Sequence, residues 1–379
     1  MKYGWFIAFM HNETPTEVKI VVSDLHLGAG TRPGEENPYE DFYQDERFEE
    51  LLMHYSEGLF AEMPVELIIN GDFLDLLKVP YKGQFVTEVT EEIALEKVRR
   101  CIRGHKKVFD ALSSFVSKPN HKVTYIAGNH DLDIAFEKVQ ALIRARLGLD
   151  DNSDAVKFVV EEQFYRLPSG IVVTHGHEFE EMNRIEPRTP LIEREDGTKI
   201  VNMPWGSKFF ANVIAPAKAE RRIIDLVQPL SSFILWGLFF DMRFTLGMLW
   251  RIILFFLRTR VKTIYERELN VTKTLQILGE EFAFYSNLER RASALLRESQ
   301  DIRVLIVGHS HNPRFRRYPR GKIYVNSGTW VQRVSLDLNN LGTSTILTYV
   351  ECTYFQGRPP TVRLLRWRGK MRTMEEVVF

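Results

Sequence analysis

The chain has 379 residues, 44% hydrophobic and 26% charged, so it can bury a sizeable core as one large domain or two ordinary ones. The chain has 50 lysine and arginine residues and 50 aspartate and glutamate residues, and this balance excludes a chain-wide basic surface. Nucleic acid is therefore not expected as a partner. Neither of the two cysteines, Cys101 and Cys352, belongs to a CxxC pair. This argues against a thiolate zinc site or a disulfide framework and predicts a reducing, cytoplasmic location.

Short apolar runs alternate with helical windows in the first part of the chain, and strands dominate its end. Helices are predicted at residues 48–57 and 91–115. Strands separated by helices indicate an α/β fold with much parallel pairing. The predicted strands are residues 18–23, 67–70, 122–127, 171–174, 304–307, 322–326, 344–352 and 361–367.

A polar motif follows each of the first five strands, where open α/β sheets usually place ligand sites. Aspartate, asparagine and histidine without cysteine suit divalent ions such as Mn, Fe, Zn or Co. If the backbone stays extended, alternate residues of a motif would point into one pocket, and the glycines allow sharp turns and close approach. The motifs are Asp24-Leu25-His26, Gly71-Asp72, Gly128-Asn129-His130-Asp131, His175-Gly176-His177 and Gly308-His309-Ser310-His311.

Two metal ions would suit an anionic phosphate ester, because a metal pair lowers the pKa of a bridging water and neutralises phosphoryl charge. One carboxylate has to bridge the ions. Asp72 is the natural candidate, since it has two oxygens and its motif lies between the other early ones. Each motif alone arises by chance in a chain of this length, so the prediction rests on the ordered set of five.

That ordered set resembles the calcineurin-like metallophosphoesterase superfamily, over residues 18–177 and 301–330. The resemblance implies an α/β fold in which two mixed β-sheets pack face to face with helices outside, an αββα sandwich. It also implies two divalent metal ions, with manganese the first choice. By the same resemblance, the first ion would take Asp24, His26, Asp72 and His311, and the second would take Asp72, Asn129, His175 and His309.

The resemblance gives His130 a place beside the scissile phosphate, where it would donate a proton to the leaving oxygen or stabilise charge. Asp131 would orient His130, as a carboxylate commonly orients a histidine. His177 either supports a metal ligand or is a satisfied loop histidine. Asp75 either caps the following helix, the favoured role, or holds a ligand. Asn326 matches a late Asn-x-Gly segment that closes the sheet near the metal pocket.

Differences between classes narrow the expected reaction. Ser/Thr protein phosphatases usually carry an arginine soon after Gly-Asp, and this chain has none there. Residues 23–28 and 326–331 look like bacterial UDP-diacylglucosamine hydrolases, which usually have arginine in place of His130. We therefore expect a metal-bridging hydroxide to cleave a phosphodiester or pyrophosphate in a small phosphorylated substrate, lipid-linked or a nucleotide sugar. The alternatives are a cyclic-nucleotide phosphodiesterase or nuclease, and a metal-free scaffold.

Residues 178–300 are long, helix-like and locally very apolar. They are predicted to be a helical insertion or lid in one metallophosphoesterase domain made of residues 1–177 and 301–379. Residues 226–240 carry no charge but are too few to span a membrane. Eight basic and three acidic residues between 218 and 262 suit a helix pair at the anionic inner face of a membrane, or a lid over a lipid tail. The alternative is a hairpin buried in its own domain or in an oligomer.

Overall fold

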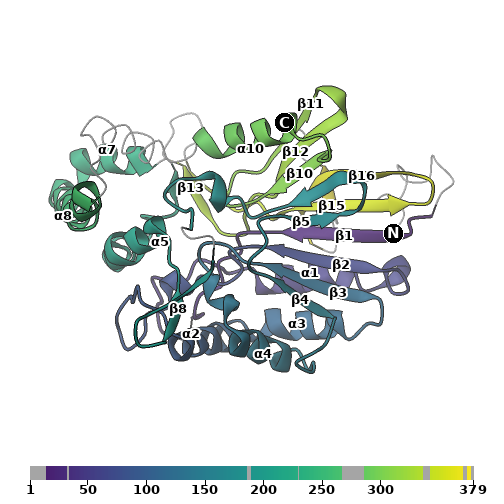
Figure 1. Cartoon of the computed structure of the whole chain (residues 1–379), viewed down its shortest axis with the longest axis horizontal. Coiled ribbons are helices and arrows are strands. Elements are labelled where there is room, and N and C mark those ends of the chain that lie inside the picture. The colour runs from purple at the N-terminus through teal and green to yellow at the C-terminus, as the bar shows by residue number, and fades with distance from the viewer. Residues whose placement is uncertain are drawn as a thin grey trace.

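Two β-sheets face each other and carry helices on their outer surfaces (Figure 1). The computed structural model describes residues 14–31, 34–185, 189–228, 230–266, 286–335, 342–369 and 374–376. The larger sheet has seven strands in the order β17-β16-β15-β1-β2-β3-β4, and the smaller has five in the order β11-β12-β10-β6-β5. The predicted fold class, an αββα sandwich, is confirmed.

Parallel pairing places several strand ends at one edge of each sheet. In the larger sheet β1, β2, β3 and β4 run parallel, and β15 lies antiparallel to β1. In the smaller sheet β10 runs parallel to both β6 and β12. The strands of the larger sheet are β1 (Glu17–Val22), β2 (Val65–Asn70), β3 (His121–Ile126), β4 (Val156–Val159), β15 (Thr348–Phe355), β16 (Arg358–Trp367) and β17 (Met374–Glu376). Those of the smaller sheet are β5 (Tyr165–Leu167), β6 (Ile171–Val173), β10 (Val304–Val307), β11 (Arg314–Tyr318) and β12 (Lys322–Asn326).

Apolar side chains fill the space between the two sheets. Val21 and Ile68 of the larger sheet join Val173 and Ile306 of the smaller one in a single buried cluster. Because successive residues of a strand point to opposite faces, the neighbouring residues of the same strands face the outer helices. The sandwich therefore has one apolar layer inside and one on each outer side.

Helices cover the outer faces of both sheets. The outer cluster of the larger sheet includes buried residues of α1 (Asp45–His54), α2 (Glu91–Gly104), α3 (Lys106–Val116) and α4 (Glu137–Arg146). The smaller sheet is covered by α10 (Ser286–Glu298), which buries Leu288, Ala292 and Leu296 against it.

The single helix predicted at residues 91–115 is two helices, and this prediction was wrong. They separate at His105, whose ψ of 44° is not helical. A Cβ at Gly104 would lie 2.3 Å from the carbonyl oxygen of Ala29, so the chain turns where a loop of the first motif passes closely. The predicted strand at 344–352 also differs, since Ser344 ends a separate strand, β14 (Gly342–Ser344), and β15 begins at Thr348.

The region predicted as an insertion contains a small apolar core of its own, which includes Phe209, Val213, Ile224, Met248 and Ile252. Short strand pairing ties it to the rest of the chain, because β9 pairs with β13 (Arg333–Ser335). The domain boundaries stay a prediction, although α10, assigned to the insertion, packs on the smaller sheet. The elements before α10 are β7 (Leu191–Glu193), β8 (Lys199–Val201), α5 (Trp205–Phe209), a π-helical turn (Phe210–Ile214), α6 (Ala215–Lys218), β9 (Val227–Gln228), α7 (Leu230–Phe240) and α8 (Met242–Glu266).

Candidate metal centre

Asp24, His26 and His311 form one cluster of groups that could hold a metal ion, with ligand atoms all within 4.8 Å of one another. Asp24 and His26 follow β1 of the larger sheet, and His311 follows β10 of the smaller one. The Nε2 atoms of His26 and His311 are 3.0 Å apart, and Asp24 Oδ1 lies 3.3 Å from His311 Nε2. Burial lowers the pKa of His311 to about 4, so its imidazole is neutral, as a metal ligand must be.

A second cluster joins Asp72, His175 and His309 under the same distance limit. Asp72 follows β2, whereas His175 and His309 follow β6 and β10 of the smaller sheet. His175 Nε2 lies 3.2 Å from Asp72 Oδ2, and the rings of His175 and His309 are 5.2 Å apart. Each cluster therefore draws on both sheets.

Asp72 connects the two clusters through one oxygen. Its Oδ2 lies 3.2 Å from His175 Nε2 and 3.8 Å from His26 Nε2, while its Oδ1 accepts the backbone N–H of His130. This is the arrangement that a bridging carboxylate requires, and the two clusters contain six of the seven predicted ligands. The seventh, Asn129, follows β3 and has a buried Oδ1 without a hydrogen-bond partner.

The backbone reaches this arrangement in a way that sequence reasoning did not foresee. The motifs are not extended, because five ligand residues have positive φ, a conformation uncommon outside glycine. Left-handed residues turn the chain between ligands, so Asp24 and His26 reach one cluster, whereas His309 and His311 divide between two. The five residues are Asp24, His26, Asp72, His309 and His311, with φ between 51° and 65°.

Two glycines let the motif loops approach each other. A Cβ at Gly128 would lie 2.1 Å from Oδ1 of Asp72, and one at Gly71 would lie 2.4 Å from Nδ1 of His175. Gly71 also has a φ of +78°, which disfavours any side chain. The predicted close approach at these two glycines is therefore present.

Buried atoms without partners test whether the site fits metal ions. Oδ1 of Asp24, Oδ1 of Asn129 and Nε2 of His175 are buried and make no hydrogen bond. Such atoms are rare in folded proteins because leaving them unpaired is costly, and all three can donate an electron pair to a cation. Nδ1 of His175 lies 2.8 Å from the carbonyl oxygen of Asn70, which fixes the proton there and leaves Nε2 free. The residues present thus fit divalent cations.

The charge around Asp72 favours a cation as well. Burial opposes protonation of His175, but the Asp72 carboxylate outweighs it and raises the pKa of His175 to about 10, so a metal ion at Nε2 would displace a proton from this imidazole. Carboxylates at this place thus attract positive charge.

Glu180 is a supporting residue that sequence reasoning missed. Its Oε2 lies 2.8 Å from Nε2 of His309 and accepts the side-chain N–H of Asn183 at 3.0 Å. Burial raises the pKa of Glu180, but His309 outweighs it and lowers the value overall. Nε2 therefore carries the imidazole proton, and Nδ1 of His309 keeps the electron pair for a metal. Glu180 stands in an acidic run, Glu178-Phe179-Glu180-Glu181, where nothing distinguishes it in the sequence.

Asp75 holds two histidines of the site, which corrects its predicted role as a helix cap. Its Oδ1 lies 2.9 Å from Nδ1 of His130, and its Oδ2 lies 3.0 Å from Nδ1 of His26. Asp75 makes no capping hydrogen bond to the short helix after it. The second of its two predicted roles, holding a ligand, is the one that the structure supports.

Asp131 does not orient His130, so that prediction was wrong. Its Oδ1 accepts the backbone N–H of Gly128 at 2.6 Å, and its Oδ2 accepts the backbone N–H of Phe73 and the hydroxyl of Tyr125. The side chain turns back into the sheet and joins the motif loops after β2 and β3. Its role is to hold the loop that carries His130.

The two remaining supporting residues occupy different positions. His177 is buried, belongs to neither ligand cluster, and has its Nε2 3.4 Å from Oε1 of Glu178. Asn326 donates to the carbonyl oxygen of Gly308 and to Ser310, inside the loop that carries His309 and His311. Asn326 is therefore placed to support that loop.

The region predicted as an insertion contributes residues beside the site. Ser207 in α5 donates its hydroxyl to the carbonyl oxygen of Asn129 at 3.1 Å. The ring of Phe210, in the π-helical turn, lies 5.5 Å from the His130 ring. π-Helical turns are frequent at functional sites. Neither residue carries a sequence signal for this role.

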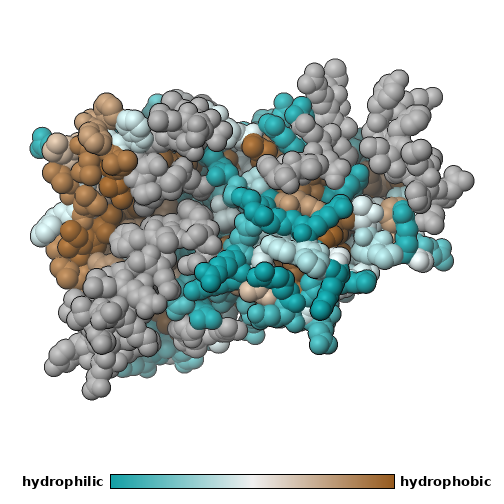
Figure 2. Space-filling view, turned by 90° about the horizontal axis from the view of Figure 1, so that it is seen from above, coloured by the Kyte–Doolittle hydropathy of each residue, from teal (hydrophilic) through white to brown (hydrophobic). Residues whose placement is uncertain are grey.

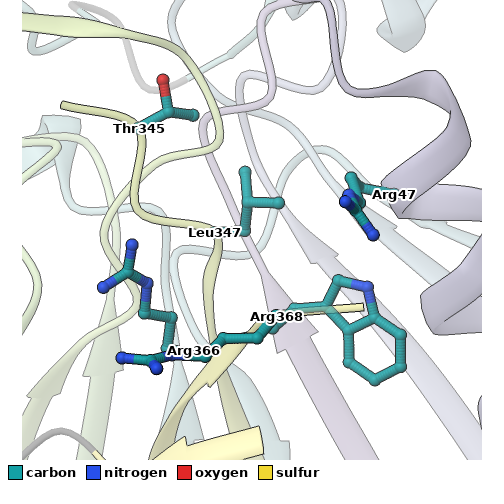
Figure 3. Close-up of a pocket in the computed structure, with 6 residues that line it drawn as sticks. Arg47, Thr345, Leu347, Arg366 and Arg368 are labelled. Carbon is teal, nitrogen blue, oxygen red and sulfur yellow. The ribbon is translucent and has the colours of Figure 1, made fainter. Parts of the chain in front are cut away.

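A surface pocket of about 470 Å³ lies at another place, between α1 and the end of β16 (Figure 3). Three arginines line it, and none of the predicted ligands does. Its lining residues are Arg47, Thr345, Leu347, Arg366, Trp367 and Arg368.

Comparisons with solved structures returned distant similarities. A predicted phosphoesterase from Streptococcus pneumoniae is 12% identical, over 95% of this chain and 96% of its own, with a TM-score of 0.30. A dimetal phosphatase from Danio rerio is 11% identical, over 97% and 100%, with a TM-score of 0.39. Vps29 with Zn²⁺ from Entamoeba histolytica is 11% identical, over 95% and 98%, with a TM-score of 0.30. These TM-scores are too low to support an argument about function.

The sequence itself decides the family. No curated protein sequence matches the chain significantly. The family model described as calcineurin-like phosphoesterase matches residues 20–237, which is more than half of the chain and includes four of the five motifs. The chain therefore belongs to the calcineurin-like phosphoesterase family and is a metal-dependent phosphoester hydrolase.

Proposed function

We propose that the protein uses two divalent metal ions to hydrolyse a phosphodiester or pyrophosphate bond in a substrate that carries an apolar tail. The observation that carries the proposal is the position of Asp72, one oxygen of which faces histidines of both clusters. The ions, when bound, lower the pKa of a water and neutralise charge on the phosphoryl oxygens. Manganese is the ion we propose to test first.

The residues of the chain divide the remaining tasks. The predicted ligands Asp24, His26, Asp72, Asn129, His175, His309 and His311 hold the ions. Asp75 holds Nδ1 of His130, so Nε2 is the nitrogen that gives a proton to the leaving oxygen. Phe210 lies against His130 and excludes water from that side.

The apolar surface of α7 and α8 is the reason for proposing that the substrate carries an apolar tail. Figure 2 shows a large hydrophobic area at the end of the molecule where Figure 1 places these two helices. Phe239 and Phe240 are 75% and 79% exposed. Soluble monomers rarely expose a contiguous apolar area of this kind without a function for it. The exposed apolar side chains are Leu235, Trp236, Phe239, Phe240, Met242, Leu246, Trp250, Ile253 and Leu257.

Basic residues beside this surface favour an anionic membrane as the partner from which a lipid-linked substrate would be taken. Arg243 and Arg258 are exposed on α8. Lys218, one of the eight basic residues between 218 and 262, is fully buried and does not face a membrane. No helix among the described residues is long and apolar enough to cross a membrane, so the proposed contact is peripheral.

Turnover on two substrates tests the proposal. The purified protein with Mn²⁺ would be assayed side by side on a UDP-linked diacyl sugar and on a plain chromogenic phosphodiester. Strong preference for the lipid supports the proposed substrate class. Turnover of the plain diester alone would keep the phosphoesterase and reject the apolar tail. Asp72→Asn is the matched control, and full activity in that variant would reject the ligand assignment.

A further inference from the structure

Five charged side chains lie buried together where the insertion meets the loops after β1 and β2. Asp75 and Lys218 are 0% exposed, and Asp225 is the most exposed of the five at 10%. Lys78 and Asp75 follow β2, whereas Lys218 ends α6 of the insertion. Burying an ion is expensive unless it is paired, so the cluster must keep a defined geometry. The five residues are Asp41, Asp75, Lys78, Lys218 and Asp225.

Two lysines link the three carboxylates. The Lys78 ammonium lies 3.0 Å from Oδ2 of Asp75 and 2.7 Å from Oδ2 of Asp225, and it also bonds Asp41. The Lys218 ammonium donates to Oδ1 of Asp41 at 2.9 Å and also bonds Asp225. Asp41 and Asp225 each contact both lysines, so Lys78 is held from the side of the insertion.

Asp75 connects this cluster to the metal centre. Its Oδ2 is shared between the Lys78 ammonium and Nδ1 of His26, and its Oδ1 is bonded to Nδ1 of His130. A carboxylate with partners on both oxygens is fixed in rotation. Without the Lys78 contact the two imidazoles would remain as partners, but the carboxylate would lose the ammonium that holds it from the opposite side, so its hold on both rings would loosen.

We propose that Lys218 and Asp225 of the insertion are positioning residues for His130, an inference that rests on the proposed proton transfer by His130. Asp225 and Lys218 hold Lys78, Lys78 holds the Asp75 carboxylate, and Asp75 holds the imidazole. Through Lys218 and Asp225, the segment that begins at α5 then supports the catalytic centre. The helices α7 and α8, which follow this segment, carry the apolar surface.

The effect of Asp225→Asn follows from charge. The variant keeps the shape of the side chain but removes one of the three carboxylates around Lys78. Lys78 and Lys218 then compete for Asp41, and Lys78 moves away from Asp75. A misaligned proton donor slows the reaction most when the leaving group is a poor one, because a good leaving group departs without protonation.

Two aryl phosphodiesters provide the test, one releasing p-nitrophenolate and one releasing phenolate. We expect Asp225→Asn to lower kcat for the phenyl ester about tenfold or more. This is part of the ~100- to 10,000-fold rate increase that a proton donor contributes. The kcat for the p-nitrophenyl ester should fall much less. The assays are run at saturating Mn²⁺, because Asp75 also holds the metal ligand His26, and KM should then stay unchanged. Lys218→Met should likewise lower kcat for the phenyl ester much more than for the p-nitrophenyl ester, a difference called the split below. Asp225→Glu should restore part of the phenyl ester rate.

His130→Gln and Glu220→Gln serve as references. In the His130→Gln background, Asp225→Asn should have no further effect, because the two act through one group. Glu220 lies between Lys218 and Asp225 in sequence but forms an exposed ion pair with Arg251 of α8 and does not contact the buried cluster, so its variant should cleave both esters at the original rates. The positioning role would be overturned if Asp225→Asn and Lys218→Met lowered kcat for both esters equally and in proportion to the fraction of folded protein. Absence of the split in His130→Gln itself would overturn the proposed proton transfer instead.

Discussion

Nδ1 of His130 lies 2.9 Å from Oδ1 of Asp75, a residue 55 positions earlier in the chain. The other oxygen of Asp75 lies 3.0 Å from Nδ1 of His26. One buried carboxylate therefore fixes the tautomer of the proposed proton donor and of a predicted metal ligand, and a change at Asp75 should affect both functions together.

Asp75→Asn should lower kcat and weaken metal binding. The amide offers one acceptor instead of two oxygens, so one imidazole loses its partner. We expect kcat to fall by about 100-fold or more, which is within the range of a general acid, and metal affinity to fall by about 10- to 100-fold, as for other groups that orient ligands. Steady-state kinetics at saturating Mn²⁺ and metal titration would measure the two effects separately.

Asp131→Asn should behave differently, because Asp131 accepts hydrogen bonds from three backbone amides and from the hydroxyl of Tyr125. Placing an amide N–H against these donors leaves buried groups unpaired, which costs about 1–3 kcal/mol of unfolding free energy each. Urea unfolding should show the loss, whereas kcat per folded molecule should fall far less than in Asp75→Asn. A larger kcat effect in Asp131→Asn than in Asp75→Asn would restore the role first predicted for Asp131.

Replacing Trp236, Phe240 and Trp250 by serine should reduce binding to vesicles that contain anionic lipid. Each buried aromatic side chain contributes roughly 1.5–3 kcal/mol, so the triple variant should bind at least tenfold more weakly in a flotation assay. Leu59→Ser, which changes an exposed apolar residue far away in the chain, is the matched control. Arg243→Ser should matter only with anionic vesicles, by about 1 kcal/mol. Undiminished binding by the triple variant would remove the membrane proposal.

His105 should make the stability of the fold depend on pH. Burial lowers its pKa, but hydrogen bonds to Asp45 and Glu40 outweigh burial and raise the pKa to about 9. Since this value lies above that of the unfolded chain, the stabilisation is complete below about pH 6.5 and disappears as pH rises through 9. The total is at most about 3 kcal/mol.

Urea unfolding of the original protein and of His105→Gln at several pH values between 6 and 10 would measure this contribution. The difference in unfolding free energy between the two proteins should shrink as pH rises, because glutamine does not titrate. A constant difference across that window would show that the ion pairs of His105 do not stabilise the fold.

Gly128→Ala should remove metal binding while it leaves the sheets intact. The new Cβ would lie 2.1 Å from Oδ1 and 2.5 Å from the backbone nitrogen of Asp72, and a backbone atom cannot move aside cheaply. Metal content measured after purification should fall, and circular dichroism should change little. Gly247→Ala is the control, since nothing lies within 4 Å of its Cβ and alanine favours the helix by about 1 kcal/mol. Full metal content in Gly128→Ala would contradict the close packing at Asp72.

The sequence was sufficient for the five strands that precede the motifs and for the identity of the residues that gather at their ends, but β4, β5 and β11 were not predicted. Strand ends of parallel sheets meet at one edge, so an ordered set of Asp, Asn and His motifs predicts a shared site without coordinates. Asp72 was predicted to bridge the ions from its two oxygens and from the position of its motif, and its Oδ2 faces histidines of both clusters.

Orientation and burial were harder to predict, because they depend on where the chain turns. Asp131 is adjacent to His130 in sequence but points into the sheet, while the distant Asp75 reaches the imidazole. Lys218 and Asp225 look like ordinary charges in an amphipathic stretch, and only the tertiary structure brings them to Lys78. Left-handed backbone at Asp24 and four other ligands follows from the packing of the loops and has no local sequence signal.

Each ligand cluster takes residues from both sheets, and this has a mechanical consequence. Ions bound at that edge would cross-link the two sheets, because any sliding of one sheet over the other would stretch the metal–ligand bonds of both clusters. Among the described residues, no such cluster lies at the opposite edge of the larger sheet, where Glu17 of β1 pairs with Tyr354 of β15. Removal of the ions by a chelator should therefore speed amide hydrogen exchange around Asp24 and His175 much more than around Glu17. Local separation of the two sheets would then begin at the edge that binds the metal ions.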